Sequence, residues 1–324
     1  MSVDVFETVG SFYKRTVSSD TLGEPVGRIL HCLNPFPVKP ATEHERAQSI
    51  TLRSIRYAKQ VTAATAPNLR IEHVAAILQS DNVQTELEFD HRVQLTRSVS
   101  DFQKFKIHRD LPLLYDIITS APANPNDIII FTNVDISIVP TFYLFIENIF
   151  RRGCDCVVVN RRTISDVYSS ESDIHLMSAE VGTKHPGHDC FALRASLLKE
   201  FVPFQSCVGI AGAARPLLYN VLAYARAPTV LMDAHVTFHI GDDKTWRNKD
   251  FDDYTTFNRR ELDRVVNQLL KDKPTRIQLI NRLNSPVGQT LMSPVILERL
   301  GVRASKQWAS KLLLHRVLRR LWRT

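Results

Sequence analysis

Residues 127–136 read Asp-Ile-Ile-Ile-Phe-Thr-Asn-Val-Asp-Ile, and this stretch decides the fold class. Its first half, from Asp127 to Phe131, is almost wholly apolar and β-branched, which is typical of a strand buried within a sheet. The strand leads directly into Asn133 and Asp135. Residues two apart in an extended chain face the same way, so these two side chains are predicted to address one ligand where the strand ends.

A helix is predicted on each side of this strand. Leucines and isoleucines recur at helical spacing over residues 110–121, and a second amphipathic pattern begins at Pro140 and ends at Gly153. Residues 154–159 then form another apolar strand. A strand, a helix and a strand in this order form a right-handed parallel crossover, so both strands should end at one edge of the sheet, where ligands bind in open α/β folds.

The rest of the chain continues this alternation. Upstream, a helix capped by Thr42 is predicted between two strands, and downstream strands and helices follow in mixed order; these predicted elements cover residues 27–33, 71–78, 189–193, 213–225, 229–232 and 258–270. The predicted fold is α/β: a Rossmann-type mixed, mostly parallel sheet flanked by helices, in a single domain with a C-terminal helical extension.

Composition favours a globular protein without a disulfide framework. The chain has 324 residues, of which 44% are hydrophobic and 23% are charged. It contains no apolar run of eighteen residues, and Asp4 and Glu7 stand where a signal peptide would be basic, so a cytoplasmic location is predicted. The five cysteines are interpreted as reduced and buried, since Cys154 and Cys156 are one residue too close for a zinc knuckle.

Charged and titratable residues follow two further predicted strand ends. Arg161 and Arg162 end the strand after Asp135, and planar guanidinium groups suit a diphosphate or a carboxylate; the alternative is an arginine pair without a ligand. The turn from residue 185 to 189 holds three further candidates. Asp189 is predicted to act as general base or to orient an acceptor, assisted by His185 or His188, although an Asx turn would also explain the aspartate.

Two histidines four residues apart, His235 and His239, lie in a segment rich in residues that favour extended chain. In a strand such residues are about 13 Å apart, which is too far to share one metal. Only one of them can therefore join Asp135, whose carboxylate is a ligand of the kind that Mg²⁺ or Mn²⁺ prefers. The alternative for Asp135 is that it caps the helix that follows.

The Asn-x-Asp pattern at residues 133–135 resembles the Asp-x-Asp motif of GT-A glycosyltransferases, with asparagine in the first position. The resemblance covers about residues 25–250. Enzymes of this family use the motif to hold a metal that bridges the two phosphates of a nucleotide-sugar donor, and a late histidine often completes the metal shell. The resemblance implies sugar transfer from a nucleotide-sugar with Mn²⁺ or Mg²⁺ at Asp135 and His239, the donor near Asn133 and the two arginines, and His235 as a core or supporting residue.

The sequence also departs from the family. The commoner inverting pattern begins a helix near the acceptor with an acidic pair, whereas residues 210–215 read Ile-Ala-Gly-Ala-Ala-Arg. This departure and the missing first aspartate motivate an alternative: a GT-A-like basic module without catalysis that binds membrane or nucleic acid. A nucleotidyltransferase or a metal-dependent hydrolase is a third hypothesis, which the lack of a glycine-rich phosphate loop and of clustered histidines disfavours.

The predicted catalytic domain covers residues 1–256, with a donor half at about 25–165 and an acceptor half at about 166–256. A helical region, residues 257–324, follows. Its last part, residues 305–324, places leucines on one side of a helix and arginines on the other. This basic amphipathic tail is predicted to contact an anionic membrane, with nucleic acid as the less favoured partner; the alternative is a helix that docks on its own domain.

Overall fold

The computed structural model describes residues 26–39, 42–81, 83, 89–168, 170–185, 187–241 and 249–284. Its centre is a seven-stranded sheet with the strand order β10-β6-β9-β4-β1-β2-β3. Strand β9 runs antiparallel to its neighbours β4 and β6, and the other pairings are parallel. The strands are β1 (Arg28–Leu33), β2 (Arg70–Leu78), β3 (His91–Leu95), β4 (Ile128–Thr132), β6 (Cys156–Val159), β9 (Cys190–Arg194) and β10 (Pro228–Leu231).

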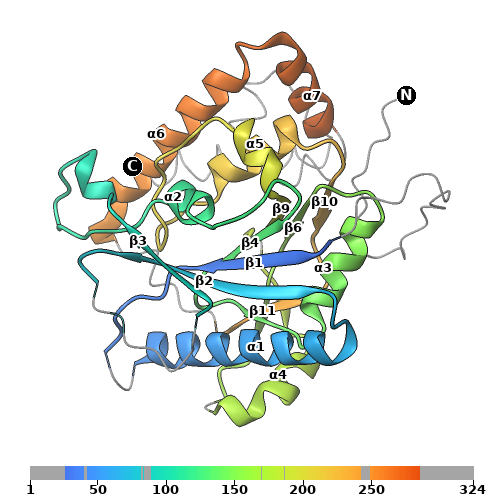
Figure 1. Cartoon of the computed structure of the whole chain (residues 1–324). Helices are drawn as coiled ribbons and strands as arrows, with labels where there is room; N and C mark the ends of the chain where they lie inside the picture. The colour runs from blue at the N-terminus through green and yellow to red at the C-terminus, as the bar shows by residue number, and fades with distance from the viewer. Residues whose placement is uncertain are drawn as a thin grey trace.

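Helices cover both faces of this sheet (Figure 1). On one face lie α1 (Glu43–Thr65), α3 (Phe142–Arg151) and α4 (Ile174–Ala179), and on the other lie α2 (Leu114–Thr119), α5 (Arg215–Tyr224), α6 (Asp252–Leu269) and α7 (Lys273–Asn284). Short 3-10 turns cover Val99–Asp101, Glu171–Asp173, Ala195–Lys199 and Lys249–Phe251. The predicted α/β class, with a mixed and mostly parallel sheet flanked by helices, is confirmed.

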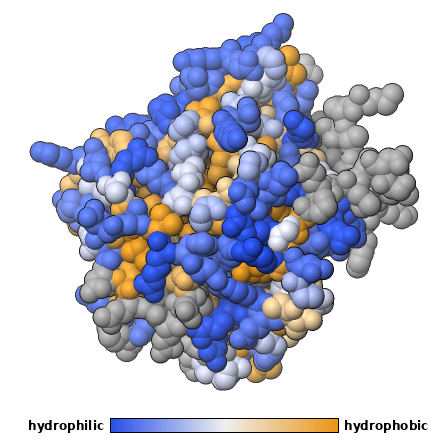
Figure 2. All heavy atoms as spheres, viewed as in Figure 1, coloured by the Kyte–Doolittle hydropathy of each residue, from blue (hydrophilic) through white to orange (hydrophobic). Residues whose placement is uncertain are grey.

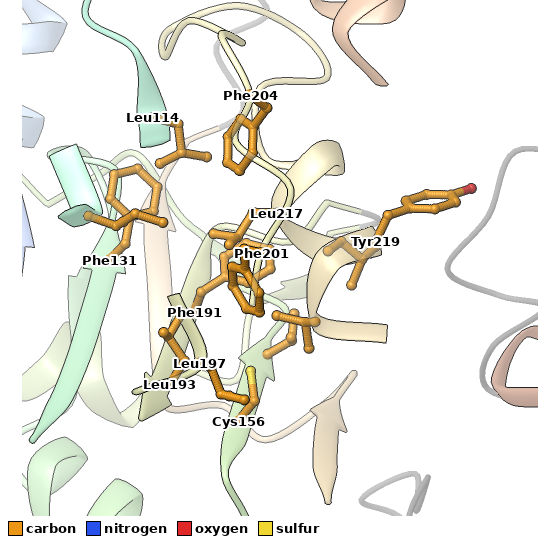
Figure 3. Packing of buried hydrophobic residues seen from close by; sticks show 14 of the residues in the cluster. Leu114, Phe131, Cys156, Phe191, Leu193, Leu197, Phe201, Phe204, Leu217 and Tyr219 are labelled. Carbon is orange, nitrogen blue, oxygen red and sulfur yellow. The ribbon is translucent and has the colours of Figure 1, made fainter. Parts of the chain in front are cut away.

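The alternation of side chains along β4 explains why the sheet has a core on each face. Ile128 and Ile130 pack under α1 and α3, whereas Ile129 and Phe131 pack on the side of α5 and α6. All four are buried, as expected of a strand at the centre of a two-faced sheet. Figure 3 shows the second of these cores, in which Phe131 lies close to Leu114.

A second, smaller sheet carries part of the candidate site. It has the order β5-β11-β7-β8, with β5 (Ser137–Ile138), β11 (Thr237–Ile240), β7 (Arg162–Ile164) and β8 (Thr183–Lys184). Strand β5 follows β4 and β7 follows β6, so this sheet begins where the parallel strands of the large sheet end. It therefore lies at the carboxyl edge, where the sequence placed the ligand.

Several predicted details are wrong. The helix expected at residues 110–121 is only Leu114–Thr119, because Pro112 and Leu113 are extended and form β-bridges. Pro140 precedes its helix, which begins at Phe142 after the N-cap Thr141. Strands β4 and β6 do run in the same direction, but β9 lies between them.

The predicted boundary after residue 256 falls inside α6, whose Leu262 and Val265 belong to the main core. The division of the chain at that residue stays a prediction. The basic tail at residues 305–324 lies outside the described residues, as do Asp242 and Asp243 in the turn after His239.

The surface and the helices give two further observations. Figure 2 shows a face that is mainly hydrophilic, with smaller hydrophobic patches, as is usual for a globular protein. Within the described ranges, no helix has the length and the apolar character needed to cross a membrane.

A network of charged groups ties four strands together at the amino edge of the large sheet, opposite the candidate site. Glu72 of β2 accepts hydrogen bonds from Arg28 of β1 at 3.2 Å and from His91 of β3 at 2.8 Å, and it also pairs with Arg70. Arg28 reaches Asp127, just before β4, at 2.5 Å. The Glu72 side chain is only 10% exposed, so this network should contribute to stability.

We expect Glu72→Gln to lower the free energy of unfolding by about 1–3 kcal/mol at neutral pH, because the mostly buried Arg28 guanidinium loses one of its two carboxylate partners and His91 loses its acceptor. Burial raises the pKa of Glu72, but His91, Arg70 and Arg28 more than offset this and lower it. The stabilisation is therefore present above the glutamate pKa of the unfolded chain and is lost as the pH falls through the lower folded-state pKa. As the pH falls, the free energies of unfolding of wild type and variant should therefore become equal. Urea unfolding at several pH values measures both.

A matched control is Asp116→Asn. The Asp116 carboxylate is buried to a similar degree, at 12% exposure, but its partner Arg97 is half-exposed. Exposed pairs contribute about 0–1 kcal/mol, so this variant should lose little stability. Equal losses in the two variants would contradict a special role for the Glu72 network.

Candidate active site

Asp135 lies in a tight turn directly after β4. The backbone N–H of Ile136 donates to the carbonyl of Asn133 at 3.1 Å, which closes the turn, so the expectation of extended chain from Asn133 to Asp135 is wrong. The turn still presents Asp135 at the carboxyl edge of the large sheet. Its Oδ2 atom lies 3.4 Å from His239 Nε2, and its Oδ1 atom is buried without a hydrogen-bond partner among the described residues.

His239 is held in one orientation by its own strand. It lies on β11 between β5 and β7, and its side chain is only 4% exposed. Its Nδ1 atom lies 2.9 Å from the carbonyl of Gly241, which can only accept, so Nδ1 carries the proton. Nε2 of the neutral ring then points a lone pair at the Asp135 carboxylate. Two acceptors that face each other in this way can share a proton or a metal cation.

Asp135 and His239 each shift the pKa of the other, in agreement with their short distance. Burial opposes the charged form of each group, but the pair stabilises both charges: the hydrogen bond and charge of His239, helped by Arg161, lower the pKa of Asp135. Conversely, burial lowers the pKa of His239 and Asp135 more than restores it, so the net change is upward. The charged forms of the two groups, carboxylate and imidazolium, are therefore favoured together.

Asp189 forms the second half of the cluster. It precedes β9, whose first residue pairs with Thr132 at the end of β4, so the fold brings Asp189 beside the Asp135 turn. Its Oδ2 atom lies 3.6 Å from Arg161 Nε and 3.7 Å from His185 Nδ1. Burial raises the pKa of Asp189, and the charges of Arg161 and His185 offset only part of this rise. A carboxylate with a raised pKa is suited to take up a proton.

Seven buried side-chain atoms have no hydrogen-bond partner in the part of the chain that the structure describes, and they lie in four short segments, three of which carry Asp135, Arg161 and Asp189 of this cluster. They are Asp135 Oδ1, Asn160 Oδ1, Arg161 Nε, His188 Nε2, Asp189 Oδ2, His235 Nδ1 and Thr237 Oγ1. Buried polar atoms in folded proteins are nearly always paired, so a concentration of unpaired ones requires an explanation. A polar ligand that binds among these segments would supply the missing partners.

The predicted site residues do not all join the cluster. Asp135, His239, Asp189, His185 and Arg161 are linked by the distances given above. Arg162 faces away: it donates to the carbonyls of Val181 at 2.7 Å and Gly182 at 2.8 Å, and it pairs with Asp233. Its contacts are structural and do not support the predicted role near the phosphates.

The other three predicted positions lie at the margin. Among the described residues, no contact joins the Asn133 side chain to the cluster, although its backbone closes the turn. Burial, with the charges of Arg215 and His185, lowers the pKa of His188 to about 4, so its ring is neutral at pH 7. His235 has a left-handed backbone with φ of 48° and contacts the carbonyl of Ser178 at 3.2 Å, in keeping with a supporting role.

Sequence reasoning missed the role of Asn160. This fully buried residue follows β6, and its side-chain amide donates to the carbonyls of His185 and of Gly187, the latter at 2.8 Å. It thereby fixes the turn that carries Asp189. The sequence does show a polar residue, Asn160, between an apolar strand and Arg161. Its hydrogen-bond partners could not be predicted, because they lie about 25 residues away in sequence.

The residues fit a divalent metal only in part. Within the described ranges, no three His, Cys, Asp or Glu side chains are grouped to hold a metal. Asp135 and His239 supply one oxygen and one nitrogen ligand, which suit Mn²⁺ or Mg²⁺ when phosphate oxygens and water complete the shell. The unpaired Oδ1 atom of Asp135 agrees with a site of this open kind.

No protein-family model matches the chain, and no curated protein matches it in sequence. Among solved structures it is similar to TarS of S. aureus, with a TM-score of 0.43 and 12% identity, over 79% of this chain and 71% of that chain. It is also similar to glucosyl-3-phosphoglycerate synthase from Mycobacterium tuberculosis, solved with Mg²⁺ and uridine diphosphate, with a TM-score of 0.41 and 14% identity, over 83% and 86% of the two chains. Because both TM-scores are below 0.5, we assign no function from this likeness.

Proposed function

We propose that the chain is a metal-dependent glycosyltransferase that moves a sugar from a nucleotide-sugar donor to an acceptor hydroxyl. The observation that carries this function is the facing pair Asp135 and His239, 3.4 Å apart, with a second carboxylate, that of the mostly buried Asp189, beside it. One carboxylate would hold the metal and the other would remain for acid–base chemistry. These two roles require carboxylates with different pKa values. The neighbours of Asp135 lower its pKa, whereas burial raises that of Asp189.

The donor would bind through its two phosphates. Asp135 and His239 would hold Mn²⁺ or Mg²⁺, which would neutralise charge on the diphosphate. Arg161 is only 6% exposed, lies next to Asp189 and provides a permanent positive charge for the leaving group. Asn133 closes the turn that carries Asp135, and its side chain would contact the donor there.

The acceptor would bind near Asp189. As general base, Asp189 removes the proton of an acceptor hydroxyl while that oxygen bonds to the anomeric carbon of the sugar. The bond from the anomeric carbon to the phosphate oxygen breaks, and the electron pair leaves with the nucleoside diphosphate. His185, 3.7 Å from Asp189, and His188 on the same turn would assist by hydrogen bonding.

We also propose where the protein acts. The sequence favours a cytoplasmic location and contact of residues 305–324 with an anionic membrane, because at helical spacing its basic residues would fall on one side and its apolar residues on the other. Nucleic acid is the less favoured partner.

The experiment that tests the function is calorimetric binding of nucleoside diphosphates and nucleotide-sugars, with and without Mn²⁺, to wild type, His239→Ala and His235→Ala. These histidines lie four residues apart, and only His239 faces Asp135. We expect His239→Ala to weaken metal-dependent binding at least about tenfold, and His235→Ala to change it less than about threefold. If no nucleotide binds wild type, the function is wrong and the module without catalysis takes its place.

A further inference from the structure

A chain of buried polar side chains lies directly beneath the candidate site, between the large sheet and α3. His31 Nδ1 lies 2.8 Å from the hydroxyl of Tyr143, and His31 Nε2 lies 2.9 Å from Thr132 Oγ1. The Tyr143 hydroxyl also contacts His73 Nε2 at 3.3 Å. All four residues are at most 1% exposed, and none of them has a role in the reaction proposed above.

The hydrogen bonds of this chain must all point the same way. Burial lowers the pKa of His31 well below its usual value and that of His73 to about 3, so both rings are neutral. A neutral ring donates from one nitrogen and accepts at the other, and the single Tyr143 proton can serve only one histidine. Removing the His31 ring therefore breaks two of these bonds and takes away the partner of the buried Thr132 hydroxyl, at a cost of about 1–3 kcal/mol.

Within this hydrogen-bonded network, His31 also connects two elements of the fold. Thr132 is the last residue of β4, and Tyr143 is the second residue of α3. His31 bonds to both, so it bridges the two ends of the segment, residues 133–142, that carries Asp135. The middle of this segment is tied to α1, since Ser54 Oγ accepts from Ile138 N at 3.1 Å and Thr51 contacts Ser137 at 3.0 Å.

We propose that His31 is a positioning residue that clamps both ends of the Asp135 segment and so keeps Asp135 in register with His239. The metal part of this inference rests on the proposed function. His31 does not touch the reacting atoms; it acts through Thr132 and Tyr143. A buried polar network is costly unless it is complete, and a complete one fixes the geometry of the elements that it joins.

His73 offers a matched control. It pairs in register with His31 on the neighbouring strand, it is equally buried, and it bonds to the same hydroxyl, but it makes no hydrogen bond to Thr132. His31→Leu and His73→Leu therefore remove the same ring from the same network. Only the first breaks the bridge between Thr132 and Tyr143.

The test compares both variants by amide hydrogen exchange and by Mn²⁺ binding in the presence of ADP, CDP, GDP or UDP. For His31→Leu we expect exchange of residues 133–139 to rise about tenfold and Mn²⁺ affinity to fall about tenfold. For His73→Leu we expect both to stay within about threefold of wild type, despite a similar loss of global stability. Exchange in β10 and α5 reports that global loss separately.

Equal changes of segment exchange in the two variants, or none in either, would overturn the proposal. If His31→Leu does not fold, Tyr143→Phe removes one end of the bridge by deleting a single oxygen and should raise exchange in the same segment. Wild type that binds no Mn²⁺ in an Asp135-dependent way would refute the proposed function, whereas the exchange comparison would still decide whether His31 holds the segment.

Discussion

Asp135→Ala is expected to weaken Mn²⁺-dependent nucleotide binding by at least about a hundredfold and to abolish sugar transfer. Substitutions of groups that merely support metal ligands already cost about 10–100-fold in affinity, and this change would remove one of the two proposed protein ligands among the described residues. The fold should persist, because the Asp135 side chain is 39% exposed and its closest charged partner is His239. Calorimetric titration with Mn²⁺ and nucleoside diphosphates measures the loss, and thermal unfolding checks the fold.

The matched control for this variant is Asp233→Ala. Asp233 is also a half-exposed carboxylate, with 48% side-chain exposure, but it pairs with Arg162 away from the cluster. Its removal should leave metal-dependent binding within about threefold of wild type, as expected for a partly exposed ion pair. An Asp135→Ala protein that binds nucleotide and Mn²⁺ like wild type would exclude the metal role.

The predicted elements were reliable where burial on both faces determined the sequence. Strand β4 could be recognised because a two-sided core demands an unbroken apolar run, from Ile128 to Phe131. Local reasoning failed just after it. Asn133, Val134 and Asp135 are compatible with extended chain, but they form a turn. The residues that flank the turn, Thr132 and Ile138, bond to side chains of β1 and α1 that lie far away in sequence.

The same limit explains the outcome for the two arginines. Arg161 and Arg162 are alike in composition, and their neighbours give no reason to separate them. Successive residues of a strand face opposite sides, so only one of the pair can reach the site. Which one does so is decided by the pairing of β7 with β11 and by the carbonyls of Val181 and Gly182, which the sequence does not place.

Asp189→Asn is expected to lower kcat by about a thousandfold while leaving the affinity for Mn²⁺ and nucleoside diphosphate within about threefold of wild type. General base catalysis contributes about 10²–10⁴-fold, and asparagine keeps the size of the side chain without its basicity. Because burial raises the pKa of Asp189 despite Arg161 and His185, the wild-type rate should fall as the pH drops through this raised value. The variant should lack that dependence.

Two measurements separate this role from donor binding. Single-turnover transfer from the nucleotide-sugar that binds wild type gives the rate of the chemical step, and calorimetry gives the donor affinity. If Asp189 is the general base, Asp189→Asn lowers the single-turnover rate and leaves the donor affinity unchanged. An affinity that falls while the rate is retained would place Asp189 in the donor site, and Arg161, 3.6 Å away, would then orient it rather than stabilise the leaving group.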